Sequence, residues 1–336
     1  MSAVGRWGRP LFGLAVAAAC IGLIFRQVQW GAIQDVWATA SLFPLLLAAV
    51  ALTADFALRI ARWWWMLRTL EPGLPYRRCV RPFLVSLAVN NTLPLRAGDV
   101  VRAVGFRDAL RVPAAHVVGT LVIERVLDAL VLLALFFAGV VGVASGTVPR
   151  GFITAALAVG IACLAAAIAV VIAPGALRGV AHRVLGTGPL GRHRWTPRLI
   201  AVVDQLLDSL SIVRSPVLAA QLLAMSIGAW ALEGAVFACV AWSLHAAAAP
   251  FGPWFSLATG TLATLLPSSP GYIGTFDYFA MLGLIAYGAS RAAAAAFALL
   301  VHLVLWLPVT VAGAAFMALG GGFGAVRQAR EAPDAT

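Results

Sequence analysis

The sequence NNTLPLRAGDVVR, residues 90–102, interrupts an apolar segment that extends from residue 82 to residue 112. Its centre combines a proline, a glycine and several charged side chains, so it is unsuited to cross a bilayer as one continuous helix. Backbone groups at membrane depth must be buried in protein or face water. We therefore predict a re-entrant helical hairpin that is broken at Pro94 and Gly98.

A second interruption, TLLPSSPGY at residues 264–272, lies within another apolar segment, 255–286. It is broken by Pro267, Pro270 and Gly271. In both interruptions a glycine follows the proline of a Leu-Pro pair by four residues. Interrupted segments at corresponding positions of two halves are typical of transporters built from inverted repeats. We predict a second re-entrant hairpin here.

The composition is that of a membrane protein. Of the 336 residues, 62% are hydrophobic and 11% are charged, against about 25% charged in soluble domains, and the mean hydropathy is +0.94. We predict one all-α transmembrane domain, 1–336, with a short interfacial helix at 26–40. The six predicted transmembrane helices are 10–25, 42–66, 113–143, 152–173, 217–244 and 292–318.

Charge predicts the topology. All 24 basic side chains are arginines, and together with 13 acids they give a net charge of +11. Many of these arginines lie in the connections 67–81 and 174–216. The positive-inside rule places both connections and both termini in the cytoplasm of a bacterial inner membrane. The spans then form two inverted repeats, 10–143 and 152–318, and the basic cytoplasmic loop 174–216 is expected to hold a short pair of amphipathic helices.

The first hairpin carries the best candidates for binding an anionic headgroup. A guanidinium next to a helix N-terminus suits a phosphate group, so we expect Arg96 and Arg102 to bind the headgroup; internal pairing of Arg96 with Asp99 is the alternative. The second hairpin has no charge near its break and is expected to hold neutral polar atoms. The full predicted binding set is Asn90, Asn91, Thr92, Arg96, Asp99, Arg102, Ser268, Ser269 and Tyr272.

Ionisable residues inside apolar helices are functional candidates. Glu124 and Asp128 share one face of the third predicted span, where they would relay protons or form a structural ion network. The neighbouring Arg125 is expected to pair with an acid. In the second span, Asp55 is expected to pair with Arg59.

Four further polar residues of the spans are expected to be less informative. Arg62, like Arg59, is long enough to reach the cytoplasmic surface. Glu233 and Asp277 are isolated acids whose partners are not evident from the sequence, and His302 is expected to be a neutral, hydrogen-bonded histidine.

Several classes of function are excluded. The four cysteines are isolated, and no Cys/His spacing indicates a metal site. No hydrolase, P-loop or dinucleotide-binding motif is present, and the arginines form no basic domain suited to nucleic acid. We predict no metal and no cofactor.

These motifs resemble the lysylphosphatidylglycerol synthase transmembrane-region family of flippase-like membrane proteins. The resemblance rests on NTLPLRAGDVVR (91–102), IERVLD (123–128), LPSSPGYIG (266–274) and the Arg62-Trp63 pair. It implies a lipid-translocating membrane domain of two inverted repeats without the aminoacyl-transferase domain of some members. It also implies functional roles for Arg96, Asp99, Arg102, Glu124 and Arg125.

We therefore expect a flippase that moves an anionic phospholipid or a polyprenyl-phosphate-linked lipid between leaflets, and not an enzyme. Two alternatives stay open. One is a membrane-embedded lipid-modifying enzyme with Glu124 or Asp128 as general base. The other is a non-catalytic membrane partner of a glycosyltransferase or other lipid- or sugar-transferase.

Overall fold

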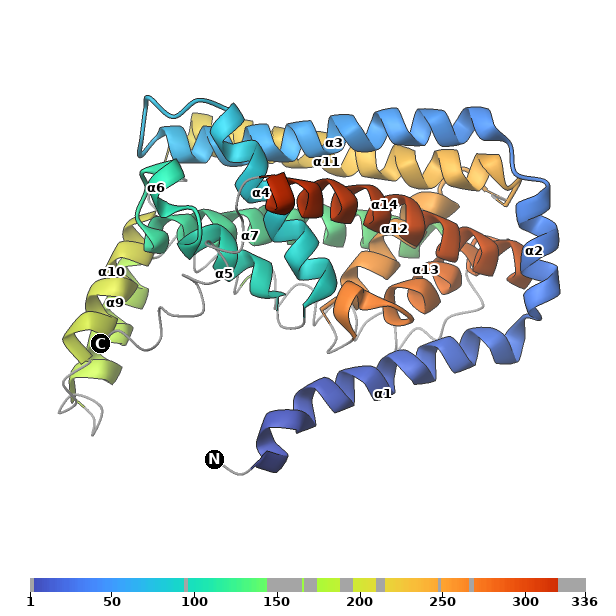
Figure 1. The fold of residues 1–336 in the computed structure, drawn as a ribbon, viewed down its shortest axis with the longest axis horizontal. Coiled ribbons are helices and arrows are strands. Elements are labelled where there is room, and N and C mark those ends of the chain that lie inside the picture. The colour runs from blue at the N-terminus through green and yellow to red at the C-terminus, as the bar shows by residue number, and fades with distance from the viewer. Residues whose placement is uncertain are drawn as a thin grey trace.

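The structure is a computed structural model that describes residues 3–93, 96–143, 165, 174–187, 196–209, 215–246, 249–265 and 269–319. All regular secondary structure in these ranges is helical (Figure 1). The elements are α1 (Ala3–Gln27), α2 (Trp30–Ala38), α3 (Leu42–Arg68), α4 (Arg77–Thr92), α5 (Ala97–Val104), α6 (Arg107–Leu110), α7 (Ala114–Gly142), α9 (Pro174–Thr187), α10 (Thr196–Ser209), α11 (Pro216–Ser243), α12 (Gly252–Ala263), the 3₁₀ turn η4 (Pro270–Tyr272), α13 (Thr275–Ile285) and α14 (Arg291–Leu319).

Three of the described helices, α3, α11 and α14, are long and apolar enough to cross a membrane. The described part of α1 and α2 would together make a fourth span, but they are bent by 77° relative to each other. The helix predicted at 113–143 is present as α7. The span predicted at 152–173 lies outside the described residues, as do the hairpin prolines Pro94 and Pro267.

Helices α3 and α11 form an antiparallel pair that extends along the molecule (Figure 1). The start of α3 is hydrogen-bonded to the end of α11, because the Ser41 amide donates to the Ser243 carbonyl at 2.9 Å and the Ser243 hydroxyl donates to the Ser41 carbonyl at 2.7 Å. The two helices also bury apolar surface against each other, and burial is the main driving force for such packing. This pair forms one wall of the cavity described below.

Both predicted interruptions are helical hairpins. In the first, α4 and α5 pack together, and the Gly98 amide donates to the side-chain oxygen of Asn90 at 2.8 Å. In the second, α12 and α13 pack together, and the Ser256 hydroxyl donates to the Ala280 carbonyl at 2.6 Å. Packed helix pairs are thus present at both predicted interruptions, but the first break precedes α5, so the prediction of a break at Gly98 was wrong because this glycine lies inside that helix.

The two hairpins start from opposite ends of the molecule and meet in its middle. The first follows the end of α3 and the second follows the end of the antiparallel helix α11. Helix α4 packs against α14 and α12 packs against α7, so each hairpin contacts the last long helix of the other half. The tip of the first hairpin, at the end of α4, contacts η4 at the tip of the second.

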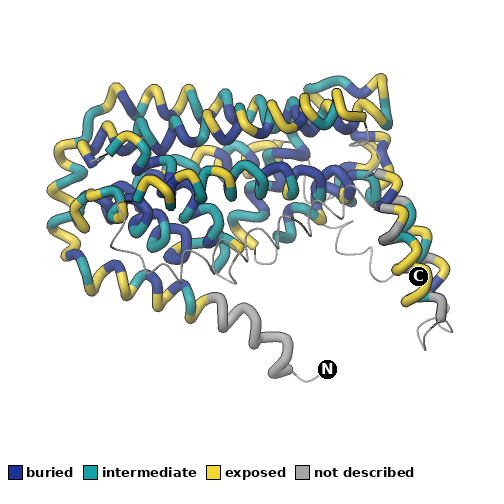
Figure 2. Tube along the Cα trace, turned by 180° about the vertical axis from the view of Figure 1, so that it is seen from behind, coloured by how far each residue is buried: buried dark blue, intermediate teal, exposed yellow. Residues whose placement is uncertain are grey.

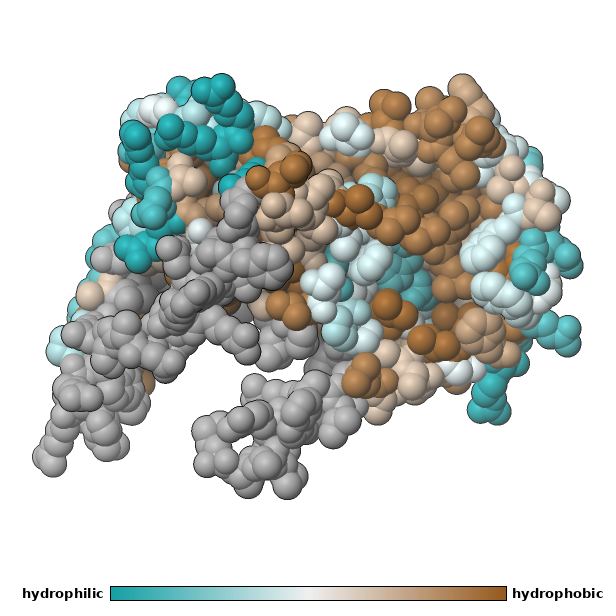
Figure 3. Space-filling view, in the orientation of Figure 1, coloured by the Kyte–Doolittle hydropathy of each residue, from teal (hydrophilic) through white to brown (hydrophobic). Residues whose placement is uncertain are grey.

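The surface is divided into an apolar face and a polar end. Large apolar side chains of α3 are exposed, among them Leu42, Phe43 and Val50, and Figure 3 shows apolar residues over much of this face. Polar residues gather around the connection between α3 and α4. Helices α6, α9 and α10 lie at this same end (Figure 1), and α9 and α10 form the helix pair that was predicted within 174–216.

Buried residues line the interior between the long helices (Figure 2). They form two apolar clusters. One, around Phe237, Met281 and Phe297, joins α11, α13 and α14. The other, around Trp63 and Phe83, joins α3 and α4. The predicted interfacial helix is present as α2, which packs on α14 and donates from the Trp37 indole to the Ala296 carbonyl at 3.0 Å.

Gly98 is needed for the close approach of α5 to α4. A Cβ at this position would lie 1.8 Å from the Ser86 carbonyl oxygen, a backbone atom that has little room to move. We expect Gly98→Ala to lower the free energy of unfolding by about 1–3 kcal/mol or more, as overpacking does. The measurement is unfolding in detergent followed by tryptophan fluorescence. Gly22→Ala is the control, because nothing lies within 4 Å of a Cβ there. Equal stability of the two variants would contradict this account of the hairpin.

Candidate functional site: a cavity at the meeting point of the two hairpins

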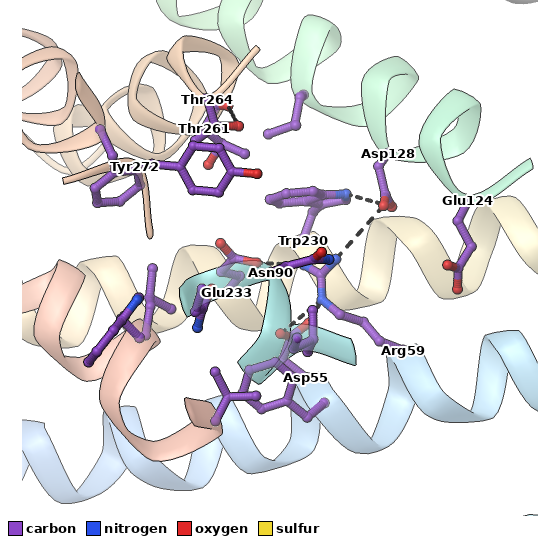
Figure 4. Close-up of a pocket in the computed structure, with 18 of the residues that line it drawn as sticks. Asp55, Arg59, Asn90, Glu124, Asp128, Trp230, Glu233, Thr261, Thr264 and Tyr272 are labelled. Carbon is purple, nitrogen blue, oxygen red and sulfur yellow. Dashed lines mark hydrogen bonds and ion pairs between the residues drawn. The ribbon is translucent and has the colours of Figure 1, made fainter. Parts of the chain in front are cut away.

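A cavity of about 340 Å³ lies where the hairpin tips meet (Figure 4). Its volume is within the range of small-molecule sites, about 300–1,000 Å³. The lining residues come from α3, α4, α7, α11, both hairpin tips and α14, so both halves of the chain build it. Its polar lining residues include Asp55, Arg59, Arg62, Asn90, Asn91, Arg96, Arg102, Glu124, Arg125, Asp128, Glu233, Thr261, Tyr272, His302 and Trp306.

Arg59 on α3 connects two acids. Its Nε lies 2.7 Å from an Asp55 carboxylate oxygen, one helical turn earlier, and its Nη2 lies 2.5 Å from Glu233 on α11 (Figure 4). The guanidinium also lies 4.4 Å from the ring centroid of Trp230, a cation–π distance. The predicted Asp55–Arg59 pair is confirmed, and Glu233 has its partner.

Arg62, one further turn along α3, is also buried. Its side chain is only 2% exposed, and Nη1 donates to Asp128 on α7 and to the Ser226 hydroxyl on α11, both at 2.6 Å. Asp128 also accepts a hydrogen bond from the Trp230 indole at 3.1 Å. The expectation that Arg59 and Arg62 reach the cytoplasmic surface was therefore wrong, because acids on neighbouring helices neutralise them inside the protein.

Arg102 on α5 extends the same network. Its Nη1 lies 3.1 Å from Glu124 and its Nε lies 2.9 Å from the Ser86 hydroxyl. The guanidinium stacks on Phe83 at 4.3 Å from the ring centroid. With its side chain 1% exposed, Arg102 already has an internal partner for its charge.

Among the described residues this network joins three arginines and four acids from α3, α5, α7 and α11: Arg59, Arg62, Arg102, Asp55, Glu124, Asp128 and Glu233. Charges in a low-dielectric interior are tolerated when they are paired and hydrogen-bonded. The predicted shared face of Glu124 and Asp128 is real, and both acids are committed to arginines. The network thus ties helices from both halves around the cavity.

Arg96 differs from every other arginine of the cavity. It lines the cavity and takes up the left-handed conformation, with φ 54°, at the break of the first hairpin. Within the part of the chain that the structure describes, Arg96 makes no ion pair or hydrogen bond. Asp99, its expected internal partner, instead accepts from the Asn90 amide at 3.0 Å and lies 3.7 Å from Arg125. Arg125 has the acidic partner that was predicted for it.

The remaining predicted binding residues are placed as follows. Asn91 lines the cavity and donates to the Thr310 hydroxyl at 2.8 Å. Thr92 is exposed and its hydroxyl donates to the Ala88 carbonyl of its own helix. Tyr272 lines the cavity (Figure 4), whereas Ser269 is exposed and bonds the Ile273 carbonyl. Ser268 lies outside the described residues.

Sequence reasoning missed the contribution of α11. Ser226, Trp230 and Glu233 are spaced by four and three residues, so they share one helix face, and all three contact the arginines of α3 or their acids. That spacing was visible in the sequence. What could not be seen was that α11 packs on α3. No group of metal-ligating side chains is present among the residues that the structure describes.

The comparison with known families matches the region of the chain that builds this cavity. The family model described as "Lysylphosphatidylglycerol synthase TM region" matches residues 11–313. The chain belongs to this family. The match includes every residue of the cavity network, so the resemblance drawn from the hairpin motifs is confirmed. Membership in the lysylphosphatidylglycerol synthase TM-region family makes this a membrane, lipid-related protein. No curated protein sequence matches the chain significantly.

The buried network predicts a large cost for breaking one of its pairs. Arg62→Ala leaves Asp128 with only the more distant Arg59, at 4.0 Å, and Glu124 with only Arg102; breaking a buried pair typically costs about 3–5 kcal/mol. The measurement is the free energy of unfolding in detergent. Arg178→Ala is the control, because this arginine pairs with Asp204 and Asp208 at the exposed surface of α9 and α10, where pairs contribute about 0–1 kcal/mol. Equal losses in the two variants would show that the network does not stabilise the fold.

Proposed function

We propose that this protein is a lipid transporter that moves an anionic phospholipid or a polyprenyl-phosphate-linked lipid between leaflets, with the headgroup passing through the cavity between the hairpins. The observation that carries the proposal is the guanidinium of Arg96 in that cavity, which has no ion-pair or hydrogen-bond partner among the described residues. A guanidinium is geometrically suited to two oxygens of one phosphate group. The lipid-related family of the chain agrees with this class of substrate.

Charge distribution supports Arg96 as the headgroup ligand. Arg59, Arg62, Arg102 and Arg125 are each held by acids, so an incoming phosphate would have to compete with those acids for them. Arg96 has no such competitor among the described residues. We therefore assign Arg96 to the headgroup, and Arg102 with the rest of the network to the construction of the cavity wall.

Neutral polar atoms complete the proposed headgroup site. The Thr261 hydroxyl on α12 and the Trp306 indole nitrogen on α14 are buried without a hydrogen-bond partner among the described residues, and both residues line the cavity. Buried polar atoms are normally satisfied, so their state favours a polar ligand there. This agrees with the expectation that the first hairpin supplies the charge and the second half adds neutral polar atoms beside the second break.

Apolar side chains at the hairpin tips suit the acyl chains. Leu93 beside the first break and Leu265 and Ile273 beside the second are 46%, 73% and 47% exposed. In a bilayer, such side chains would contact hydrocarbon. We propose that the acyl chains stay in the lipid at these tips while the headgroup enters the cavity.

The packing supports an inverted-repeat architecture of six transmembrane helices and two re-entrant hairpins. In the proposed repeat, α3, the first hairpin and α7 correspond to α11, the second hairpin and α14. A two-fold axis in the membrane plane would make α3 and α11 antiparallel. It would also make each hairpin pack on the last long helix of the other half, as observed. The arginine-rich end would then face the cytoplasm of a bacterial inner membrane.

The test is translocation of a fluorescent phosphatidylglycerol in proteoliposomes, read with a quencher that reaches only the outer leaflet. We expect Arg96→Ala to slow translocation about tenfold or more, the effect of losing one charged hydrogen-bonding contact. Arg111→Ala is the matched control, because Arg111 is also an arginine in the left-handed conformation, with φ 56°, but is exposed and does not line the cavity.

Equal rates for wild type and Arg96→Ala would remove Arg96 from the mechanism. A new lipid product in mass spectrometry, without movement between leaflets, would favour the lipid-modifying enzyme instead.

A further inference from the structure

The tip of the second hairpin is held to α14 by one histidine. His302 Nδ1 lies 2.7 Å from an Asp277 carboxylate oxygen on α13, and Nε2 lies 3.0 Å from the Gly271 carbonyl oxygen in η4. The side chains of His302 and Asp277 are only 14% and 3% exposed. The arrangement lies beside the ion network but shares no residue with it.

The two contacts of His302 require two protons. The Gly271 carbonyl only accepts hydrogen bonds, so Nε2 must carry a proton to bond it. A second proton must lie between Nδ1 and Asp277, on the ring or on the carboxyl group. Suppose that His302 and Asp277 together held only one proton. Then either the lone pair of Nδ1 would face the Asp277 carboxylate, or the lone pair of Nε2 would face the Gly271 carbonyl oxygen. One of the two contacts would then be repulsive.

The contact that would be lost is the one to Gly271. Asp277 is fixed from a second direction, because its other oxygen accepts from the Gly274 amide at 2.7 Å and caps α13. A carboxylate with a single Nδ1 proton opposite it keeps the charged hydrogen bond, which is the stronger type. The remaining lone pair on Nε2 then faces the Gly271 carbonyl and pushes the hairpin tip away from α14.

This tip forms part of the cavity wall. Gly271 and Tyr272 both line the cavity, and both have positive φ, 68° and 59°. Left-handed backbone at a non-glycine residue costs free energy and persists where surrounding contacts hold it. The bond from His302 is such a contact, so its loss frees a strained segment.

We propose that Asp277 and His302 form a proton-binding site that clamps the second hairpin to α14 when it holds both protons and releases the hairpin tip when one proton leaves. The ligand of this site is a proton. Its occupancy would set how open the cavity is at the second hairpin, and the proposal stands independently of which lipid the cavity accepts. The expected neutral state of His302 agrees with this geometry only if Asp277 carries the second proton.

Few other titratable groups face the pair. Cys20 of α1 lies beside Asp277, Tyr272 of η4 lies at the hairpin tip, and Glu233 of α11 lines the same cavity. The Phe276 ring packs on the imidazole at a centroid distance of 5.1 Å. Among the described residues no arginine is within ion-pair distance of Asp277, so the second proton is what balances its charge.

The hydrogen bond from His302 to Gly271 should depend on pH. The clamp is present at low pH and is lost as the pH rises and the second proton leaves. We would measure hydrogen–deuterium exchange of peptides covering 264–274 in nanodiscs from about pH 5 to about pH 8. Peptides of the buried α3 serve as the internal reference for the intrinsic pH effect. We expect about tenfold faster exchange of the hairpin tip at the high end, relative to that reference.

The decisive variant is Asp277→Asn. Its amide can donate to Nδ1 while its oxygen still accepts from Gly274, so a neutral His302 with a proton on Nε2 keeps both contacts without a second titrating proton. We expect its hairpin tip to stay protected at all pH values in the range. His116→Gln, on α7, is the control and should keep the wild-type response.

A second measurement on the wild-type protein does not depend on the variant folding. Nitrogen-15 spectra of labelled histidine, assigned by the signal lost in His302→Gln, should show a protonated Nε2 at low pH. Infrared spectra would place the second proton on Nδ1 or on the Asp277 carboxyl group, and either result supports the site.

Three results would overturn the proposal: an unprotonated Nε2 at low pH, a hairpin tip in the wild type that is equally protected at all pH values, or an Asp277→Asn variant with the wild-type pH response. These readouts are separate from lipid transport. If these measurements gave the expected results but the protein moved no lipid, the proton site would stand and the proposed function would be wrong.

Discussion

The need to neutralise arginines inside an apolar protein is the constraint on which the rest of the structure depends. Arg59 and Arg62 lie on one face of α3 with side chains only 12% and 2% exposed, so acids must lie close to neutralise them. Glu233 comes from α11 and Asp128 from α7, so satisfying the charges of one helix determines which helices surround it. Packing and electrostatics therefore select the same arrangement.

This pairing also determines what the cavity offers to a ligand. Once the acids of α3, α7 and α11 are matched to Arg59, Arg62 and Arg102, their charges are largely cancelled within the wall. Arg96 lies at the helix break before α5, in the left-handed conformation, and Asp99 is held by Asn90 and Arg125 instead. Among the described residues, Arg96 is the cavity arginine without an acidic partner, and this difference is why we propose it as the ligand of an anion.

The two hairpin breaks solve the same backbone problem by different means. At the first, the Asn90 side chain accepts from the Gly98 amide and so satisfies a group that the break exposes. At the second, His302 reaches from α14 to the Gly271 carbonyl. The first solution uses an amide side chain and the second an imidazole, whose hydrogen bonds depend on which ring nitrogens carry protons.

The sequence by itself determined the class of the protein, the positions of both hairpins and the helices that flank them, because hydropathy and the Leu-Pro and glycine breaks are local properties of the chain. It also identified Asp55, Arg59, Glu124 and Asp128, since charges stand out in apolar helices. Only the tertiary structure decided their partners. Whether Arg59 reached the surface or Glu233, and whether Arg96 or Arg102 found an acidic partner, depended on which helices pack side by side, and that packing joins residues more than a hundred positions apart in the chain.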